Sequence, residues 1–177
     1  MKEVKIKINN GIMPKKATDG SAAYDLFCPR DFIINGEEHV RGVVPLGFQV
    51  QMPADICMNI RPRSGFTLKG FEVNVNYYDE FGHIVHEDTG VRIDADCKIG
   101  LVDSDYVKNE VGVLFQVNSL DFPKPNKRYA YFKFIIPEGT RLAQAQFEFV
   151  PSIEFIECEE LDCSNDRGGG FGHTGAI

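Results

Sequence analysis

The sequence predicts a single all-β domain, built as a sandwich or a barrel. Fourteen Phe and six Tyr accompany many Val and Ile, and these residue types are enriched in strands. Short runs of alternating apolar and polar residues are separated by Gly, Pro, Asn and Asp, which is typical of many short strands. No stretch keeps a helical period, and residues 66–69 are expected to form at most a short turn. A chain of 177 residues is large enough to bury one core.

The expected strands follow one another along the chain. Their alternating or short apolar runs lie at residues 4–8, 22–27, 48–52, 56–60, 73–77, 100–102, 110–117 and 143–149. A polar loop at 11–21 and turns at 53–55 and 79–82 separate some of them. The acidic stretch 154–162 is expected to be a solvated strand edge. Residues 164–177 hold five glycines and little that could bury itself, so we expect a flexible Gly-rich tail there.

The composition limits the partners and the compartment. A net charge of −7 argues against a broad nucleic-acid-binding face, which needs clustered cations, but allows a small anion held by a few arginines. The five cysteines are scattered without a CxxC pair, and the first residues lack an apolar signal-peptide core. We therefore expect reduced thiols and a cytoplasmic location, or a nuclear one if the protein is eukaryotic or viral. No apolar run approaches membrane-spanning length, so no membrane partner is expected.

Residues 100–106 place two carboxylates beside a tyrosine at the end of an apolar strand. The run 110–117 is expected to return as the second strand of a hairpin, with Asp103, Asp105 and Tyr106 at its mouth. Asp and Ser in a turn satisfy backbone groups locally, and these residues taken alone favour that explanation. The alternative is a general base beside an aromatic wall.

Three further segments suit a phosphate-containing ligand. Arg63, Ser64 and Gly65 put a guanidinium fork, a hydroxyl and an accessible backbone at a strand end. Gln144 lies on the polar face of a strand. In residues 167–175 an arginine comes first, and glycines then flank a phenylalanine on both sides. Each segment also has an ordinary explanation: a surface turn, a solvated strand face and a disordered terminus.

Residues 83–88 contain two histidines and two carboxylates. They fall in an expected hairpin tip, and histidines three positions apart on a strand point to opposite faces. A solvated loop is therefore favoured over a metal site.

Taken together, five segments stand in one order. They are residues 23–26, 62–65, 100–106, 139–144 and 167–175, and in order and content they resemble the five motifs of the homotrimeric dUTPase family. The resemblance covers most of the chain, and five ordered motifs are far more specific than any one of them.

The resemblance implies a jelly-roll-like β-clip, a distorted barrel, with three active sites that are each built from all three subunits. It implies hydrolysis of dUTP to dUMP and diphosphate with Mg²⁺. Residues 1–163 would form the β domain, with residues 71–97 as an added hairpin, and residues 164–177 would close over the active site.

The resemblance also assigns roles to residues. Asp103 would be the general base that activates water for attack on the α-phosphorus, and Tyr106 would pack against the deoxyribose. Asp25 would place the hydrated metal through water. The other substrate-binding positions would be Arg63, Ser64, Gly65 and Gln144 at the phosphates, with Arg167, Phe171, Gly172, His173 and Thr174 from the tail.

Some features depart from the family pattern and leave alternatives open. Arg63 and Asp103 are farther apart in the sequence than the second and third motifs usually are. Between them, residues 90–97 resemble the third motif and would make Asp94 the base. Asp94 is rejected because Cys97 stands where that motif has its tyrosine. The turn after Tyr106 is one residue longer than the pattern. The alternatives are an enzyme related to dCTP deaminases and a catalytically impaired, dUTPase-like binding or regulatory protein.

Overall fold

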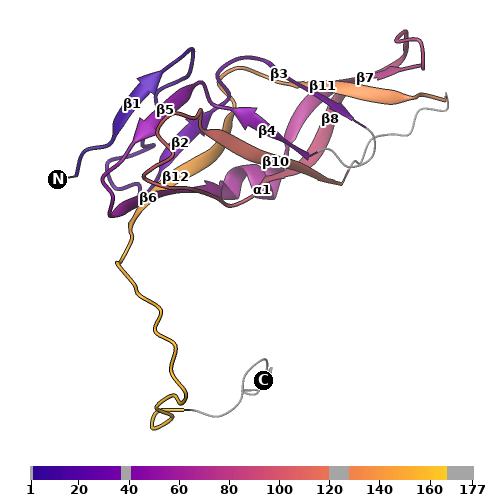
Figure 1. The fold of residues 1–177 in the computed structure, drawn as a ribbon. Coiled ribbons are helices and arrows are strands. Elements are labelled where there is room, and N and C mark those ends of the chain that lie inside the picture. Colours follow the sequence, from indigo (N-terminus) through magenta and orange to yellow (C-terminus); the bar gives the residue numbers. More distant parts are fainter. Residues whose placement is uncertain (1, 37–40, 120–127, 167–177) are drawn as a thin grey trace.

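The computed structural model describes residues 2–36, 41–119 and 128–166, whose strands form three antiparallel sheets (Figure 1). The smallest sheet pairs β1 (Lys5–Ile8) with β5 (Phe48–Gln51). The four-stranded sheet has the order β2 (Tyr24–Phe27), β12 (Arg141–Phe149), β6 (Ile56–Pro62) and β9 (Gly100–Val102). The six-stranded sheet has the order β3 (Phe32–Gly36), β11 (Tyr131–Ile136), β7 (Phe71–Tyr78), β8 (Ile84–Cys97), β10 (Gly112–Ser119) and β4 (Arg41–Pro45).

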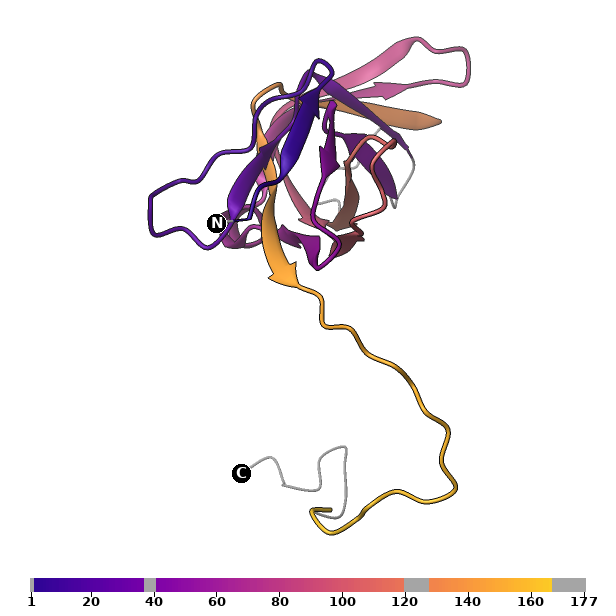
Figure 2. The same ribbon diagram turned by 60° about the vertical axis from the view of Figure 1, so that its left-hand side comes forward.

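The sheets curl around one apolar core, which confirms the predicted all-β barrel class (Figure 2). Alternation along each strand produces this core: in β11, Phe132, Phe134 and Ile136 are buried while the residues between them are more exposed. The single helix in the described ranges, α1 (Ser64–Lys69), closes one side by burying Phe66, whose ring stacks on Phe71 with centroids 5.2 Å apart. Burying a Phe side chain contributes about 2 kcal/mol, enough to fix a short helix that would not form alone.

The antiparallel pair β7 and β8 occupies residues 71–97, the segment predicted as an added hairpin, and projects from the barrel (Figure 1). Turn residues 79–82 join the strands as expected. The loop predicted at residues 83–88 is wrong, because β8 already begins at Ile84 and pairs with β7 there, with two register shifts along the pair. In this strand His86 Nε2 lies 2.9 Å from Asp88 Oδ1, beside the ring of Tyr77. Burial, followed by the charge of Asp88, raises the pKa of the Tyr77 hydroxyl.

A second correction concerns the strands around Asp103. The run 100–102 does form β9, but β9 pairs with β6, while β10 pairs with β4 and β8. The two strands therefore do not form the predicted hydrogen-bonded hairpin. Just before β9, the Lys98 N–H donates a 2.8 Å hydrogen bond to the carbonyl of Leu114 in β10. Beyond this bond the two strands diverge, and the turn between them is open. Non-local partners decided this pairing, and they cannot be read from local alternation.

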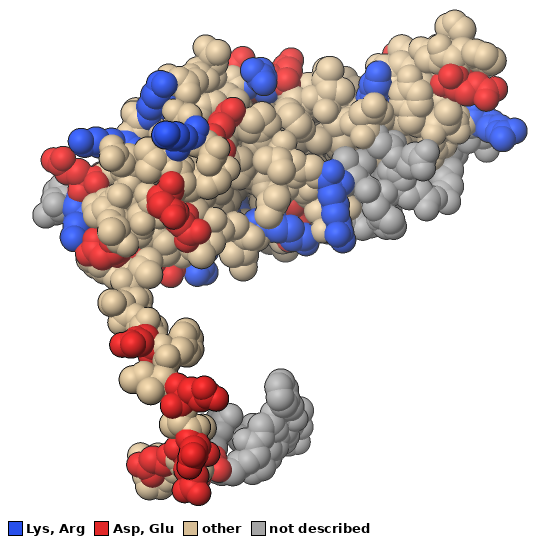
Figure 3. Space-filling model, viewed as in Figure 1, with Lys and Arg blue, Asp and Glu red and all other residues tan. Residues whose placement is uncertain are grey.

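Beyond β12 the chain leaves the barrel as an extended connector, defined as residues 150–163. The predicted strand edge at residues 154–162 is wrong, since no residue of the connector is in a strand and all are exposed. Its charged side chains are acidic, as Figure 3 shows, but large apolar side chains lie between them. Phe155 is 97% exposed, and Ile153, Ile156 and Leu161 are also mostly exposed.

Candidate active site

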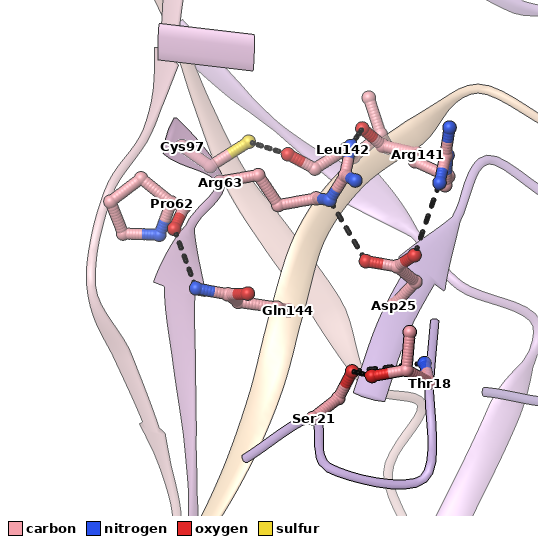
Figure 4. A network of polar contacts seen from close by, with 9 residues as sticks. All are labelled: Thr18, Ser21, Asp25, Pro62, Arg63, Cys97, Arg141, Leu142 and Gln144. Carbon is pink, nitrogen blue, oxygen red and sulfur yellow. Dashed lines mark hydrogen bonds and ion pairs between the residues drawn. The ribbon is translucent and has the colours of Figure 1, made fainter. Parts of the chain in front are cut away.

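Three strands bring Asp25, Arg63 and Gln144 together at one end of the four-stranded sheet (Figure 4). Asp25 of β2 and Gln144 of β12 are direct cross-strand partners. Arg63 follows the last residue of β6, and Gln144 Nε2 donates a hydrogen bond of 3.2 Å to the carbonyl of Pro62 beside it. The structure therefore brings together these three residues, which the sequence analysis assigned to separate motifs. We name Asp25, Arg63, Arg141 and Gln144 the charged cluster.

Asp25 is the centre of the charged cluster and is only 8% exposed. Its Oδ1 accepts a 2.8 Å hydrogen bond from Arg63 Nε, and its Oδ2 lies 3.5 Å from a terminal nitrogen of Arg141. A buried carboxylate is costly unless it is paired, so the two guanidiniums account for its burial. The cluster has one carboxylate and two guanidiniums, which leaves a net positive charge at a place open to solvent on the Arg141 side.

Arg141 was not among the predicted site residues. The motif at residues 139–144 showed an arginine on a polar strand face, a position at which solvent exposure is the ordinary explanation. Its carboxylate partner comes from β2, and only the pairing of β2 with β12 reveals it. The Arg141 side chain is 54% exposed, compared with 22% for Arg63, so it presents the more accessible cation.

Ser64 and Gly65 begin α1 directly after Arg63. A Cβ added at Gly65 would meet no atom of a described residue within 4 Å outside its immediate neighbours and the backbone of its own helix, so the described residues leave space beside this glycine. A glycine whose backbone faces open space allows an anion to approach closely. These two positions therefore adjoin the charged cluster in the manner that phosphate binding requires.

Asp103 and Tyr106 lie in the open turn between β9 and β10. The Tyr106 N–H donates to the carbonyl of Asp103 at 3.2 Å, and the Tyr106 hydroxyl donates to the carbonyl of Glu110 at 3.5 Å. The tyrosine is 41% exposed and Asp103 is exposed, so both side chains are accessible to a ligand. The rejected candidate Asp94 is exposed as well, but it lies within β8, a strand paired on both sides, and not in a turn.

Within this chain the turn is well separated from the charged cluster. Val102 pairs with Met58, five positions before Arg63, and β9 then runs away from Arg63. At about 3.3 Å per residue, the backbone of Arg63 lies roughly 16 Å from this pair, and Asp103 lies farther still. The structure thus brings Asp25, Arg63 and Gln144 together but does not bring Asp103 and Tyr106 to them.

The predicted tail residues cannot be placed against this site. Arg167, Phe171, Gly172, His173 and Thr174 lie outside the described residues. Among the described residues, no group of three or more His, Cys, Asp or Glu side chains could hold a metal ion. Asp25 is the only acidic member of the charged cluster, and both of its oxygens face guanidiniums.

A thiol nucleophile is not available beside the cluster. All five cysteines are free, as expected for reduced thiols, and Cys97 Sγ donates to the carbonyl of Leu142 at 3.1 Å (Figure 4). Burial, with a smaller effect of Asp96, raises the pKa of Cys97 to about 12. The thiolate is the reactive form, so this side chain is inert near neutral pH.

Comparison with known proteins assigns the family. The family model described as dUTPase matches residues 9–175. A deoxyuridine 5'-triphosphate nucleotidohydrolase of Caulobacter vibrioides is 31% identical over 165 residues, covering 92% of this chain and 85% of that protein. The enzyme of the same name from Helicobacter pylori is 28% identical over 176 residues, covering 97% of each chain.

Solved structures have the same fold. The dUTPase of Staphylococcus bacteriophage 80alpha with dUpNHpp superposes with a TM-score of 0.73 at 19% identity, covering 98% of both chains. A mutant dUTPase from phage phi11 of S. aureus, described with a structural Mg(II) ion, gives a TM-score of 0.66 at 17% identity, covering 90% of this chain and 99% of that one.

Proposed function

This chain belongs to the dUTPase family, and we propose that it hydrolyses dUTP to dUMP and diphosphate. The observation that carries this proposal is the charged cluster: residues from three separate motifs meet around one buried carboxylate, next to the open backbone of Gly65. A triphosphate carries about four negative charges, and preorganised guanidiniums offset such charge without reorganising during the reaction.

We assign the triphosphate to the charged cluster and the residues that adjoin it. Arg63 offers its fork, Ser64 its hydroxyl and Gly65 its backbone N–H to phosphate oxygens. Arg141 adds a second guanidinium, held loosely enough at 3.5 Å from Asp25 to turn toward a ligand. Gln144 is placed to hold a phosphate oxygen or the attacking water, because among the described residues its side chain is engaged through its amide nitrogen with Pro62, which leaves the amide oxygen available.

Asp103 is the proposed general base. An aspartate is ionised at neutral pH, so its task is to be held in position against the attacking water. It takes the proton as the water oxygen bonds to the α-phosphorus and diphosphate leaves. Tyr106 packs against the deoxyribose beside it and leaves no space for a 2′-hydroxyl.

These two half-sites belong to different protomers in the proposed enzyme. The separation of roughly 16 Å or more along β6 and β9 is too large for one substrate-bound water to contact both Asp103 and the charged cluster. The exposed apolar side chains of the connector support an assembly as well, since a soluble chain rarely leaves Phe155 and its apolar neighbours uncovered. We propose a homotrimer in which neighbouring subunits complete each active site.

The cofactor in this proposal is Mg²⁺. The described residues alone form no metal cage, and this fits a cation that keeps several waters and is held mainly by substrate phosphates. Asp25, whose two oxygens already face guanidiniums, would contact it through water. When bound, the ion neutralises phosphate charge. Arg167 and Phe171 of the tail are proposed to cover the bound nucleotide, which would exclude water from the site.

The test of this function is diphosphate release. The purified protein with Mg²⁺ is incubated separately with dUTP, dCTP, dTTP and UTP, and diphosphate and ammonia are measured. We expect rapid diphosphate release from dUTP alone. Ammonia from dCTP would identify a deaminase, and binding of dUTP without turnover would identify a regulatory protein.

A further inference from the structure

Four hydrogen bonds join the open turn that carries Asp103 and Tyr106 to the chain at the start of β5. Two of them are backbone hydrogen bonds of 2.9 Å, from the Leu46 N–H to the carbonyl of Val111 and from the Val111 N–H to the carbonyl of Phe48. The other two involve the side chains of Glu110 and Gln49. A turn held at these points has little freedom at its base, while its tip at Asp103 and Tyr106 stays exposed.

The shortest of these four hydrogen bonds joins Glu110 and Gly47. Glu110 Oε1 accepts the N–H of Gly47 at 2.6 Å in a partly buried position. Gln49 Nε2 donates to the carbonyl of Lys108 at 2.7 Å and restrains the middle of the same turn. Hydrogen bonds to an ionised carboxylate are shorter and stronger than those between neutral groups.

Gly47 is a fixed anchor for this contact. Its φ of +71° suits glycine, and a Cβ at this position would lie 2.6 Å from the Cα of Gly11. Its carbonyl accepts the N–H of Asn9 at 2.7 Å, next to the first sheet. Because Gly47 packs against Gly11 and its carbonyl is bonded to Asn9, its N–H is fixed in place and holds the Glu110 carboxylate in a defined position.

Glu110 also contacts Tyr106 directly. Its carbonyl oxygen accepts the Tyr106 hydroxyl at 3.5 Å, while its carboxylate is bound to Gly47. One residue therefore links the rigid start of β5 to the aromatic ring at the turn. Loss of the carboxylate contact would leave the Glu110 carbonyl held only through its own peptide unit, whose N–H is the Val111 donor to Phe48, and would loosen the part of the turn that leads from Tyr106 to that peptide.

We propose that Glu110 is a positioning residue that sets the place of Tyr106 and so determines discrimination against a 2′-hydroxyl. This role deepens the proposed function and rests on it, since Tyr106 must lie against the sugar of a bound nucleotide. Rejection of UTP by exclusion depends on a wall that does not move, and a ring on a loosened turn would yield to the extra hydroxyl.

The experiment compares Glu110→Ala and Glu110→Gln with the wild type. The ratio of kcat/KM for dUTP to that for UTP is measured, with separate kcat and KM values and the thermal midpoint. We expect Glu110→Ala to lower the ratio about tenfold, mainly by raising KM for dUTP and accepting UTP, with kcat for dUTP changed less than about threefold. Glu110→Gln keeps an acceptor for Gly47 and should restore most of the ratio. Glu72→Ala removes an exposed glutamate of β7 and serves as the matched control with an unchanged ratio.

A second measurement follows the contact itself. Hydrogen exchange of the Gly47 amide should accelerate in Glu110→Ala and stay slow in Glu110→Gln. An unchanged dUTP-to-UTP ratio in Glu110→Ala, or an equal fall in both variants, would overturn the role of Glu110 while leaving dUTP hydrolysis in place. A wild-type chain that releases no diphosphate from dUTP would overturn the proposed function, and this role of Glu110 with it.

Discussion

The charged cluster and the open turn each present an aspartate, but under opposite conditions. Asp25 is 8% exposed and faces two guanidiniums on strands that are fixed by their neighbours. Asp103 is exposed on a turn, and the contact at its backbone is the N–H of Tyr106 at 3.2 Å. The first aspartate is buried in the protomer, whereas the second is accessible to whatever lies opposite. In the proposed trimer, the charged cluster is the half of the site that one chain preforms, and the open turn is the half that would meet its complement on another subunit.

The largest expected effect separates the two aspartates by chemistry. Asp103→Asn removes the base but keeps the shape of the turn, so turnover of dUTP should fall by about 10³-fold with nucleotide affinity nearly unchanged. Steady-state diphosphate release and titration with a non-hydrolysable analogue measure the two quantities. Asp105→Asn is the matched control and should retain activity. Turnover like that of the wild type in Asp103→Asn would move the base elsewhere, with Asp94 the next candidate.

A second substitution separates the aspartates by stability. Asp25→Ala leaves Arg63 and Arg141 without their partner, and breaking a buried ion pair costs roughly 3 kcal/mol of unfolding free energy. Asp103→Ala, on an exposed turn, should cost less than about 0.5 kcal/mol. Urea unfolding of both variants checks the contrast. Equal losses at the two positions would contradict the view that only the charged cluster is preformed.

A smaller effect is expected at the accessible edge of the charged cluster. We assign Arg141, the more exposed guanidinium of the charged cluster, to the distal phosphates, which dUMP lacks. Arg141→Gln should therefore raise KM for dUTP about tenfold and leave the affinity for dUMP nearly unchanged. Arg41→Gln removes the same charge from β4, in the other large sheet, and is the control. A matching loss of dUMP affinity would place Arg141 near the α-phosphate instead.

The smallest effect concerns the buried thiol beside the charged cluster. The pKa of Cys97 is about 12 in the folded chain against an ordinary 9.0. Below pH 9 both states keep the proton and this contribution to stability is complete. Above pH 9 the unfolded chain releases it and the folded chain does not, so stability falls as pH rises toward 12, by roughly 1 kcal/mol per pH unit.

The measurement for this thiol is urea unfolding between pH 8 and 10.5. Cys97→Ala should flatten the alkaline decline, whereas Cys158→Ala, which removes an exposed thiol, should not. Identical slopes for the wild type and Cys97→Ala would show that Cys97 does not titrate differently in the two states.

Local sequence signals predicted the parts of the fold that depend on one strand at a time. Alternation located β1, β5, β6, β7 and β12, because each places one face in the core. It also located β9 and β10, but their predicted pairing with each other was wrong, because the choice of β6 or β8 as a partner depends on non-local contacts. The strands β3, β4 and β11 were not predicted, although Phe132, Phe134 and Ile136 alternate with less buried residues.

The candidate site likewise combines residues that local motifs indicated with contacts that depend on strand pairing. Motif order pointed to Asp25, Arg63 and Gln144, and the structure places them together. The ion pair between Asp25 and Arg141 could not be predicted, because it depends on which strands are neighbours. The distance between the charged cluster and Asp103 could not be predicted either, because it follows from the register of β6 against β9.

The most direct test of the shared site is complementation. Asp103→Asn and Arg63→Gln are each purified, unfolded, mixed in equal amounts and refolded together, and dUTP hydrolysis is compared with that of each variant refolded alone. If Asp103 of one subunit works with Arg63 of its neighbour, random mixing leaves about a quarter of the sites with both native residues, so about a quarter of wild-type activity should return. Activity that stays at the average of the two separate variants would show that one chain supplies both residues and would contradict the account.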